Sequence, residues 1–148
     1  MNPDYENIKQ ALSVLTPEEG LKWLGKHLGK EAVRFSSAFG EEDQVIACMI
    51  GSQTIPITIF TLDTGRLFQE TYDLMDLTKS KYNLDIQVYF PDHQDIEGLV
   101  RNKGLNSFYT SVENRKECCF IRKVKPLRRA LNGAAVWVTG LRSGQSAH

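Results

Sequence analysis

Two adjacent cysteines with basic neighbours are the most reactive feature of this 148-residue sequence. Cys118 and Cys119 precede Arg122 and Lys123, in a stretch from 115 to 129 that holds seven basic residues and one acidic residue. Neighbouring Cα atoms lie about 3.8 Å apart, whereas a relaxed disulfide needs roughly 4.4 Å or more. The pair is therefore two free thiols, two metal ligands or a strained redox switch. Nearby positive charge would stabilise thiolates and an anionic substrate alike.

A second segment, 36–43, combines small hydroxyl residues with a glycine between a predicted strand and a predicted helix. The hydroxyls of Ser36 and Ser37, the exposed backbone at Gly40 and the N–H groups of the helix start could bind phosphate or sulfate. The acidic residues 41–43 favour the helix dipole but would repel an anion, so we expect them to point aside. A capped turn without a ligand would show the same pattern.

Two other turns carry an arginine close to a glycine. In the segment 62–66, Gly65 permits a tight turn against which a base or ribose could lie, and Arg66 could meet an anion. In the loop that begins at Gly140, Arg142 is a candidate sulfate or phosphate contact because its planar guanidinium suits such oxyanions. The alternative for each arginine is an exposed side chain on a plain turn.

Strand and helix patterns alternate along the chain and would bring these loops together. They predict strands at 32–35, 56–62, 86–90 and 134–139, and helices at 43–51, 67–81, 95–102 and 118–131, after an N-terminal helical pair at 5–15 and 17–28. The run at 56–62 is apolar and β-branched, which favours a buried strand, and Thr16 with Glu19 predicts a capping box at the start of the second helix. This order favours an α/β fold with a doubly wound, mainly parallel sheet and flanking helices, in a single domain over 1–148. Because such sheets bind ligands at the carboxyl ends of their strands, the loops 36–43, 62–66 and 140–146 should share one rim.

Composition argues against several other classes of protein. Eighteen basic residues balance eighteen acidic ones, which argues against a dedicated nucleic-acid binder. We find no apolar run of roughly 18 residues and no signal peptide, and therefore expect a cytoplasmic protein without a membrane segment. Three cysteines do not form a disulfide framework, and we expect Cys48 to be a core thiol. None of the three histidines suggests a metal site.

Four segments resemble the family of phosphoadenylyl-sulfate and adenylyl-sulfate reductases, which have the adenine nucleotide α-hydrolase-like fold. Ser-Ser-x-Phe-Gly-x-x-Asp at 36–43 resembles the modified phosphate-binding loop of that superfamily. Leu-Asp-Thr-Gly-Arg at 62–66, with Glu-Thr-Tyr at 70–72, and Trp-x-Thr-Gly-x-Arg-x-x-Gln-Ser at 137–146 resemble two substrate-rim segments of the reductases. Cys-Cys-x-x-Arg-Lys-x-x-Pro-Leu at 118–127 resembles the branch that carries a four-iron four-sulfur (4Fe-4S) cluster.

The resemblance implies reduction of adenylyl sulfate to sulfite and AMP in sulfate assimilation, with thioredoxin as electron donor. It implies that Cys118 and Cys119 are two of four cluster ligands, with the lysine between cluster and substrate sulfate. Because members that use phosphoadenylyl sulfate generally lack the cysteine pair, it also implies adenylyl sulfate as substrate. The implied substrate-binding residues are Ser36, Ser37, Phe39, Gly40, Asp43, Leu62, Asp63, Thr64, Gly65, Arg66, Arg122, Lys123, Gly140 and Arg142.

The family also has a second cysteine pair and a nucleophilic cysteine beyond the segments matched in this chain. We therefore expect the 148 residues to bind adenylyl sulfate or AMP weakly, to hold an incomplete cluster, to form no mixed disulfide with thioredoxin and to be inactive. The sequence predicts no particular oligomeric state. The alternatives are a phosphoadenylyl-sulfate reductase, an inactive nucleotide-binding module, or an ATP pyrophosphatase or ATP-using sulfate adenylyltransferase subunit. Phe39 and Gly40 count against the ATP-using enzymes, whose loop should be richer in glycine.

Overall fold

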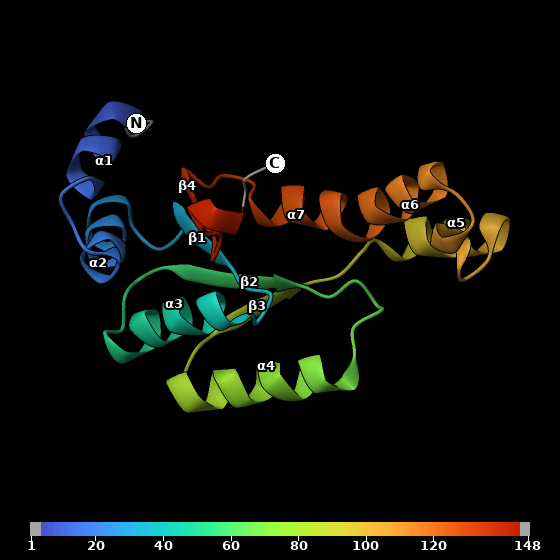
Figure 1. Cartoon of the computed structure of the whole chain (residues 1–148), viewed down its shortest axis with the longest axis horizontal. Coiled ribbons are helices and arrows are strands. Elements are labelled where there is room, and N and C mark those ends of the chain that lie inside the picture. Colours follow the sequence, from blue (N-terminus) through green and yellow to red (C-terminus); the bar gives the residue numbers. More distant parts are fainter. Residues whose placement is uncertain (1–3, 146–148) are drawn as a thin grey trace.

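The computed structural model describes residues 4–145, and its centre is a four-stranded parallel sheet (Figure 1). The strands are β1 (Val33–Ser36), β2 (Thr58–Leu62), β3 (Ile86–Tyr89) and β4 (Val136–Val138), in the spatial order β3-β2-β1-β4. All three pairings are parallel. The chain first adds strands on one side of β1 and then returns to add β4 on the other side, which creates a switch point at the carboxyl end of β1.

Helices cover both faces of this sheet, as the sequence predicts. Helix α3 (Glu41–Ser52) joins β1 to β2 and helix α4 (Gln69–Tyr82) joins β2 to β3, and the two pack together on one face (Figure 1). The return to β4 runs through α5 (His93–Lys103), α6 (Val112–Cys119), a π-helical turn (Phe120–Val124) and α7 (Lys125–Ala130). Helix α7 packs on β2 and β3 from the opposite face (Figure 1). The α/β, doubly wound prediction is confirmed.

The N-terminal helical pair is also present, as α1 (Tyr5–Leu12) and α2 (Pro17–Leu28). Thr16 accepts a hydrogen bond from the Glu19 N–H at 3.3 Å, and the Glu19 carboxylate accepts one from the Thr16 N–H at 2.9 Å. This reciprocal pair is the capping box that the sequence predicts for the second helix. The capping box fixes the residue at which α2 begins.

Strand β2 lies at the centre of the core, as its β-branched sequence predicts. Phe60 is fully buried, and Ile59 packs with Phe35 of β1 and Ile86 of β3 in the apolar cluster between sheet and helices. A strand covered on both faces needs apolar side chains on both. The strand begins at Thr58 and not at Pro56, because proline has no N–H to give to a neighbouring strand.

The basic helix differs most from its prediction. Helical structure begins at Val112, where Ser111 caps the helix by accepting the Asn114 N–H at 3.1 Å, and continues through the π-helical turn to Ala130. Short 3-10 turns lie at Ser107–Tyr109 and Ser143–Gln145. Within residues 4–145, no helix combines the length and the apolar character needed to cross a membrane.

Candidate functional site

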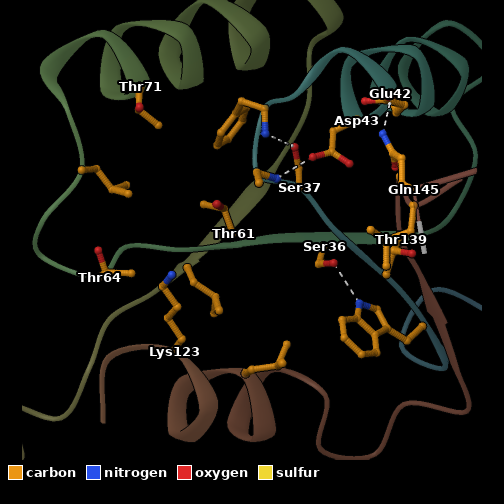
Figure 2. A pocket seen from close by; sticks show the side chains of 18 residues that line it. Ser36, Ser37, Glu42, Asp43, Thr61, Thr64, Thr71, Lys123, Thr139 and Gln145 are labelled. Atoms are coloured by element: carbon orange, nitrogen blue, oxygen red, sulfur yellow. Dashed lines mark hydrogen bonds between the residues drawn. The ribbon is translucent and has the colours of Figure 1, made fainter. Parts of the chain in front are cut away.

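A cavity of about 540 Å³ lies at the carboxyl ends of β1, β2 and β4 (Figure 2). The three loops that were expected at one rim do meet there, although Ser146 lies outside the described residues. The lining consists of Ser36, Ser37, Ala38, Phe39, Glu42, Asp43, Thr61, Leu62, Thr64, Leu67, Thr71, Lys123, Leu127, Trp137, Thr139, Gly140, Leu141 and Gln145.

The backbone of the loop after β1 is largely engaged within the protein. The Ser37 N–H donates to the Phe60 carbonyl at 2.9 Å, the Ala38 N–H to the Asp43 carboxylate at 2.8 Å, and the Phe39 N–H to the Ser37 hydroxyl at 3.1 Å. Phe39 is buried and has a left-handed φ of 62°. These three amides therefore shape the loop. The N–H groups at the start of α3, which the sequence suggested as donors to an anion, are not among these three amides.

The expectation that the acidic residues point aside is wrong for two of them. Asp43 is 9% exposed and turns back into its own loop, and a Cβ placed on Gly140 would lie 2.3 Å from its Oδ1. Glu42 lines the cavity, pairs with Arg142 at 2.7 Å and accepts a hydrogen bond from Gln145 at 3.1 Å. The backbone N–H at the helix start, then Arg142 and Gln145, hold the pKa of Glu42 below its usual range.

Hydroxyl groups supply most of the polar lining of the cavity. They belong to Ser36, Ser37, Thr61, Thr64, Thr71 and Thr139. Trp137 donates its indole N–H to the Ser36 hydroxyl at 2.8 Å, which orients that oxygen (Figure 2). Among the described residues of the lining, Lys123 is the one basic side chain, and it extends from its helix towards the end of β2 (Figure 2). This combination suits a ligand that has both hydroxyl groups and negative charge.

Hydrogen bonds fix the turn after β2. Buried Asp63 accepts the Gly65 N–H at 2.8 Å and the Tyr72 hydroxyl at 3.0 Å, and the bond to this carboxylate raises the pKa of Tyr72. Gly65 has a φ of 74°, a conformation that favours glycine. The guanidinium of buried Arg122 donates to the Thr64 carbonyl at 2.6 Å. Asp63, Gly65 and Arg122 thus shape the turn and are not part of the cavity lining.

A second cavity, of about 410 Å³, holds the cysteine pair. Cys118 is buried and Cys119 is exposed, and both are free thiols. Thr64 and Lys123 line this cavity as well as the first, so they form a wall between the larger cavity and the thiols. The sequence prediction that these thiols and the lysine lie together is consistent with this geometry.

The sequence suggested the cysteine pair as ligands of a 4Fe-4S cluster. A four-iron cluster of this type is held by four thiolates. Within residues 4–145, no three cysteine, histidine or carboxylate side chains gather as metal ligands would. Cys48 lies on α3, is only half-buried and does not belong to the core cluster, which corrects the expectation of a core thiol. Cys118 and Cys119 therefore fit two ligand positions, and the described residues do not complete the set.

Two arginines that the sequence singled out are not part of the lining of the larger cavity. Arg66 donates to the Leu105 carbonyl and the Asn106 side chain, each at 3.1 Å, and stacks over the Phe108 ring at 4.7 Å. Arg142 is 70% exposed and is held by Glu42. Six further residues at the site were not among the predicted site residues, although all except the first stand in the family motifs: Thr61, Thr71, Tyr72, Trp137, Thr139 and Gln145.

Comparison with known proteins identifies the family. The model described as "Phosphoadenosine phosphosulfate reductase domain" matches residues 32–148. An adenosine 5'-phosphosulfate reductase of Agrobacterium fabrum is 50% identical over 119 residues, which cover 80% of this chain and 45% of that protein. An adenosine 5'-phosphosulfate reductase of Burkholderia cepacia is 42% identical over 141 residues, which cover 90% of this chain and 56% of that protein. The chain thus spans about half the length of these bacterial relatives.

A solved structure agrees with the sequence matches. The phosphoadenylyl-sulfate reductase of Candida auris, crystallised as a phosphate complex, superposes with a TM-score of 0.78 at 28% identity and covers 99% of this chain and 72% of that one. The family match over residues 32–148 includes all four strands of the sheet. The chain therefore belongs to the phosphoadenosine phosphosulfate reductase domain family.

Proposed function

We propose that this chain supplies the nucleotide-binding region of an adenylyl-sulfate reductase, which reduces adenylyl sulfate to sulfite and AMP in sulfate assimilation. The observation that carries the proposal is the position of Lys123, which lines both the hydroxyl-rich cavity and the cavity of the cysteine pair. A substrate with a nucleotide at one end and a sulfate at the other needs both environments side by side. The names of the relatives from Agrobacterium fabrum and Burkholderia cepacia support the same substrate.

The cavity suits the parts of adenylyl sulfate. Apolar side chains that include Leu62, Leu67 and Leu127 give a surface on which an adenine can lie. The serine and threonine hydroxyls can donate to phosphate oxygens and accept from ribose hydroxyls. The ammonium of Lys123 then offsets the charge of the sulfate next to the thiols. Asp43 and Gly140 are part of the cavity lining, and Asp63 fixes the turn after β2 by accepting the Gly65 N–H.

The remaining parts of the proposal concern partners of the site. Cys118 and Cys119 would supply two thiolates to a 4Fe-4S cluster beside the substrate. The other ligands would come from a longer protein or another chain. Thioredoxin is the proposed electron donor. A cytoplasmic location and a single domain over 1–148 stay predictions from the sequence.

A phosphoadenylyl-sulfate reductase is the second candidate, because the family model and the Candida auris structure carry that name. The vicinal pair Cys118–Cys119 favours adenylyl sulfate. The family assignment favours either reductase over an ATP pyrophosphatase. A nucleotide-binding module without turnover would have the same cavity and stays an alternative.

Calorimetric titration of the 148-residue protein tests the proposal. We expect AMP and adenylyl sulfate to bind, and Lys123→Ala to weaken adenylyl sulfate by about tenfold, since a charged hydrogen bond contributes about 1.5 kcal/mol or more, with a smaller effect on AMP. Lys116→Ala removes an exposed charge from the same basic segment and should change neither affinity. Equal losses for both lysine variants would contradict the assignment. Tighter binding of adenosine 3',5'-bisphosphate than of AMP would favour the second candidate.

A further inference from the structure

Glu42, Arg142 and Gln145 form a closed hydrogen-bonded group at the margin of the larger cavity. The Glu42 carboxylate pairs with the Arg142 guanidinium at 2.7 Å and accepts from the Gln145 amide at 3.1 Å. The Gln145 carbonyl oxygen in turn accepts the Arg142 backbone N–H at 3.1 Å. Each member bonds the other two, so the loop after β4 is tied to the first turn of α3.

The carboxylate occupies the place on Arg142 that an oxyanion ligand would take. A guanidinium presents a planar set of N–H donors, and carboxylate, sulfate and phosphate compete for the same donors. Glu42 itself lines the cavity, so the guanidinium that it holds lies at the cavity margin and not within it. An anion entering the cavity therefore finds the arginine that could bind it already engaged by a carboxylate.

We propose that Glu42 is a positioning residue that holds Arg142 while the cavity is free of ligand and releases it when an oxyanion binds. The proposal rests on the proposed function, because it takes a nucleotide oxyanion as the ligand. Exposed ion pairs are weak, and the Arg142 side chain is 70% exposed. The binding free energy of a ligand oxyanion is therefore sufficient to displace the Glu42 carboxylate from the guanidinium. Before binding, the pair neutralises both charges and fixes the loop after β4.

Calorimetry with AMP on the 148-residue protein tests this exchange. Glu42→Gln should bind AMP about two- to five-fold more tightly than the unmodified chain, the range expected for loss of an exposed ion pair. Glu41→Gln removes one charge from the same helix start, where residue 41 is exposed and has no side-chain hydrogen bond or ion pair within residues 4–145, and it should leave the affinity unchanged.

A double-mutant cycle separates exchange from a general charge effect. Arg142→Gln should weaken AMP binding, and in that background Glu42→Gln should have no further effect, because the competition needs the guanidinium. If Glu42→Gln tightens AMP equally in both backgrounds, or weakens it, or leaves it unchanged in the unmodified background, the proposal is overturned.

Hydrogen exchange on the ligand-free protein keeps the two proposals apart. If Glu42 holds the loop, the amides of residues 140–145 should exchange several-fold faster in Glu42→Gln than in Glu41→Gln. Equal exchange in the two variants overturns the holding role even if AMP binds. If AMP does not bind to the unmodified chain, the nucleotide-binding proposal fails, while faster exchange would still support the tie between Glu42 and the loop.

Discussion

Gly140 lies so close to Asp43 that its position has no room for a side chain. A Cβ there would be 2.3 Å from the carboxylate Oδ1 and 3.2 Å from the Asp43 backbone nitrogen. Asp43 is buried and holds the Ala38 N–H, so it cannot withdraw without breaking that bond. The contact therefore sets the distance between the loop after β1 and the loop after β4.

Gly140→Ala should accordingly be destabilising and should weaken nucleotide binding. We expect the free energy of unfolding to fall by about 1–3 kcal/mol, the usual range for overpacking, and AMP affinity to fall with it. Gly144→Ala is the matched control in the same loop, because nothing lies within 4 Å of a Cβ there. Denaturant unfolding and calorimetry measure both effects. Equal stability of the two variants would show that the loops adapt freely.

The sequence identified many of the residues that gather at the cavity, but not how its charged side chains are paired. Ser36 and Ser37 line it because they stand at the end of β1, and Lys123 lines it from the π-helical turn. The partners of the two arginines come from distant segments: Asn106 for the first and Glu42 for the second. A motif gives residue type and order, whereas the direction of a long side chain depends on tertiary neighbours.

At the scale of elements, local signals predicted the starts of helices where the stabilising contacts are themselves local. The Thr16–Glu19 capping box is such a case. The helical segment around the cysteines is the opposite case, because its start at Val112 and its π-helical turn do not follow from the basic pattern at 118–131. The π-helical turn places the buried Arg122 so that it donates to the Thr64 carbonyl. This contact joins segments far apart in the sequence, so the local pattern does not predict it.

The capping box gives a prediction that depends on pH. Hydrogen bonds from the Thr16 backbone and hydroxyl, more than the nearby Lys22, lower the pKa of Glu19 in the folded chain. Its contribution to stability is therefore present above the pKa that it has in the unfolded chain and is lost as the pH falls through the lower, folded value. Glu19→Gln should be less stable than the unmodified chain at neutral pH, and the difference should vanish in acid.

Thermal unfolding over a series of pH values measures this difference. Glu18→Gln is the control. Glu18 lies in the same helical turn and pairs with Lys22, but it makes no hydrogen bond to the Thr16 cap. Thr16→Ala should cost about 1 kcal/mol, as loss of a helix cap usually does. A difference between Glu19→Gln and the unmodified chain that persists unchanged at low pH would contradict the ionised capping box.

For the whole molecule, the order of the strands explains why the cavity lies where it does. The chain reverses its direction of strand addition at β1, and the cavity lies at this switch point, at the carboxyl ends of β1, β2 and β4. The alternating pattern of the sequence predicted a parallel, doubly wound sheet, since parallel strands need helical crossovers of this length, but it did not predict the order of the strands. The three cysteines are all within the described residues, and none of them lines the larger cavity.

This distribution of thiols predicts the iron content of the isolated chain. Anaerobically purified protein should contain less than one four-iron cluster per chain, because two thiols at one cavity do not fill four ligand positions. With adenylyl sulfate and an outside thiol it should release no AMP above a blank. Iron and acid-labile sulfide assays and AMP chromatography measure these outcomes. Cys118→Ser with Cys119→Ser is the background control, and stoichiometric iron in the unmodified chain would mean that other molecules supply the missing ligands.

The lysine shared by the two cavities also couples what happens in each. A change of charge at the thiols, by alkylation, oxidation or metal binding, alters the field at the ammonium of Lys123 and with it the affinity for an anion on the other side. Thermodynamic reciprocity then requires that a bound anion change the affinity of the thiols for their own ligand by the same factor. Because Lys123 and Thr64 line both cavities, a ligand bound in one cavity changes the affinity of the other cavity for its own ligand.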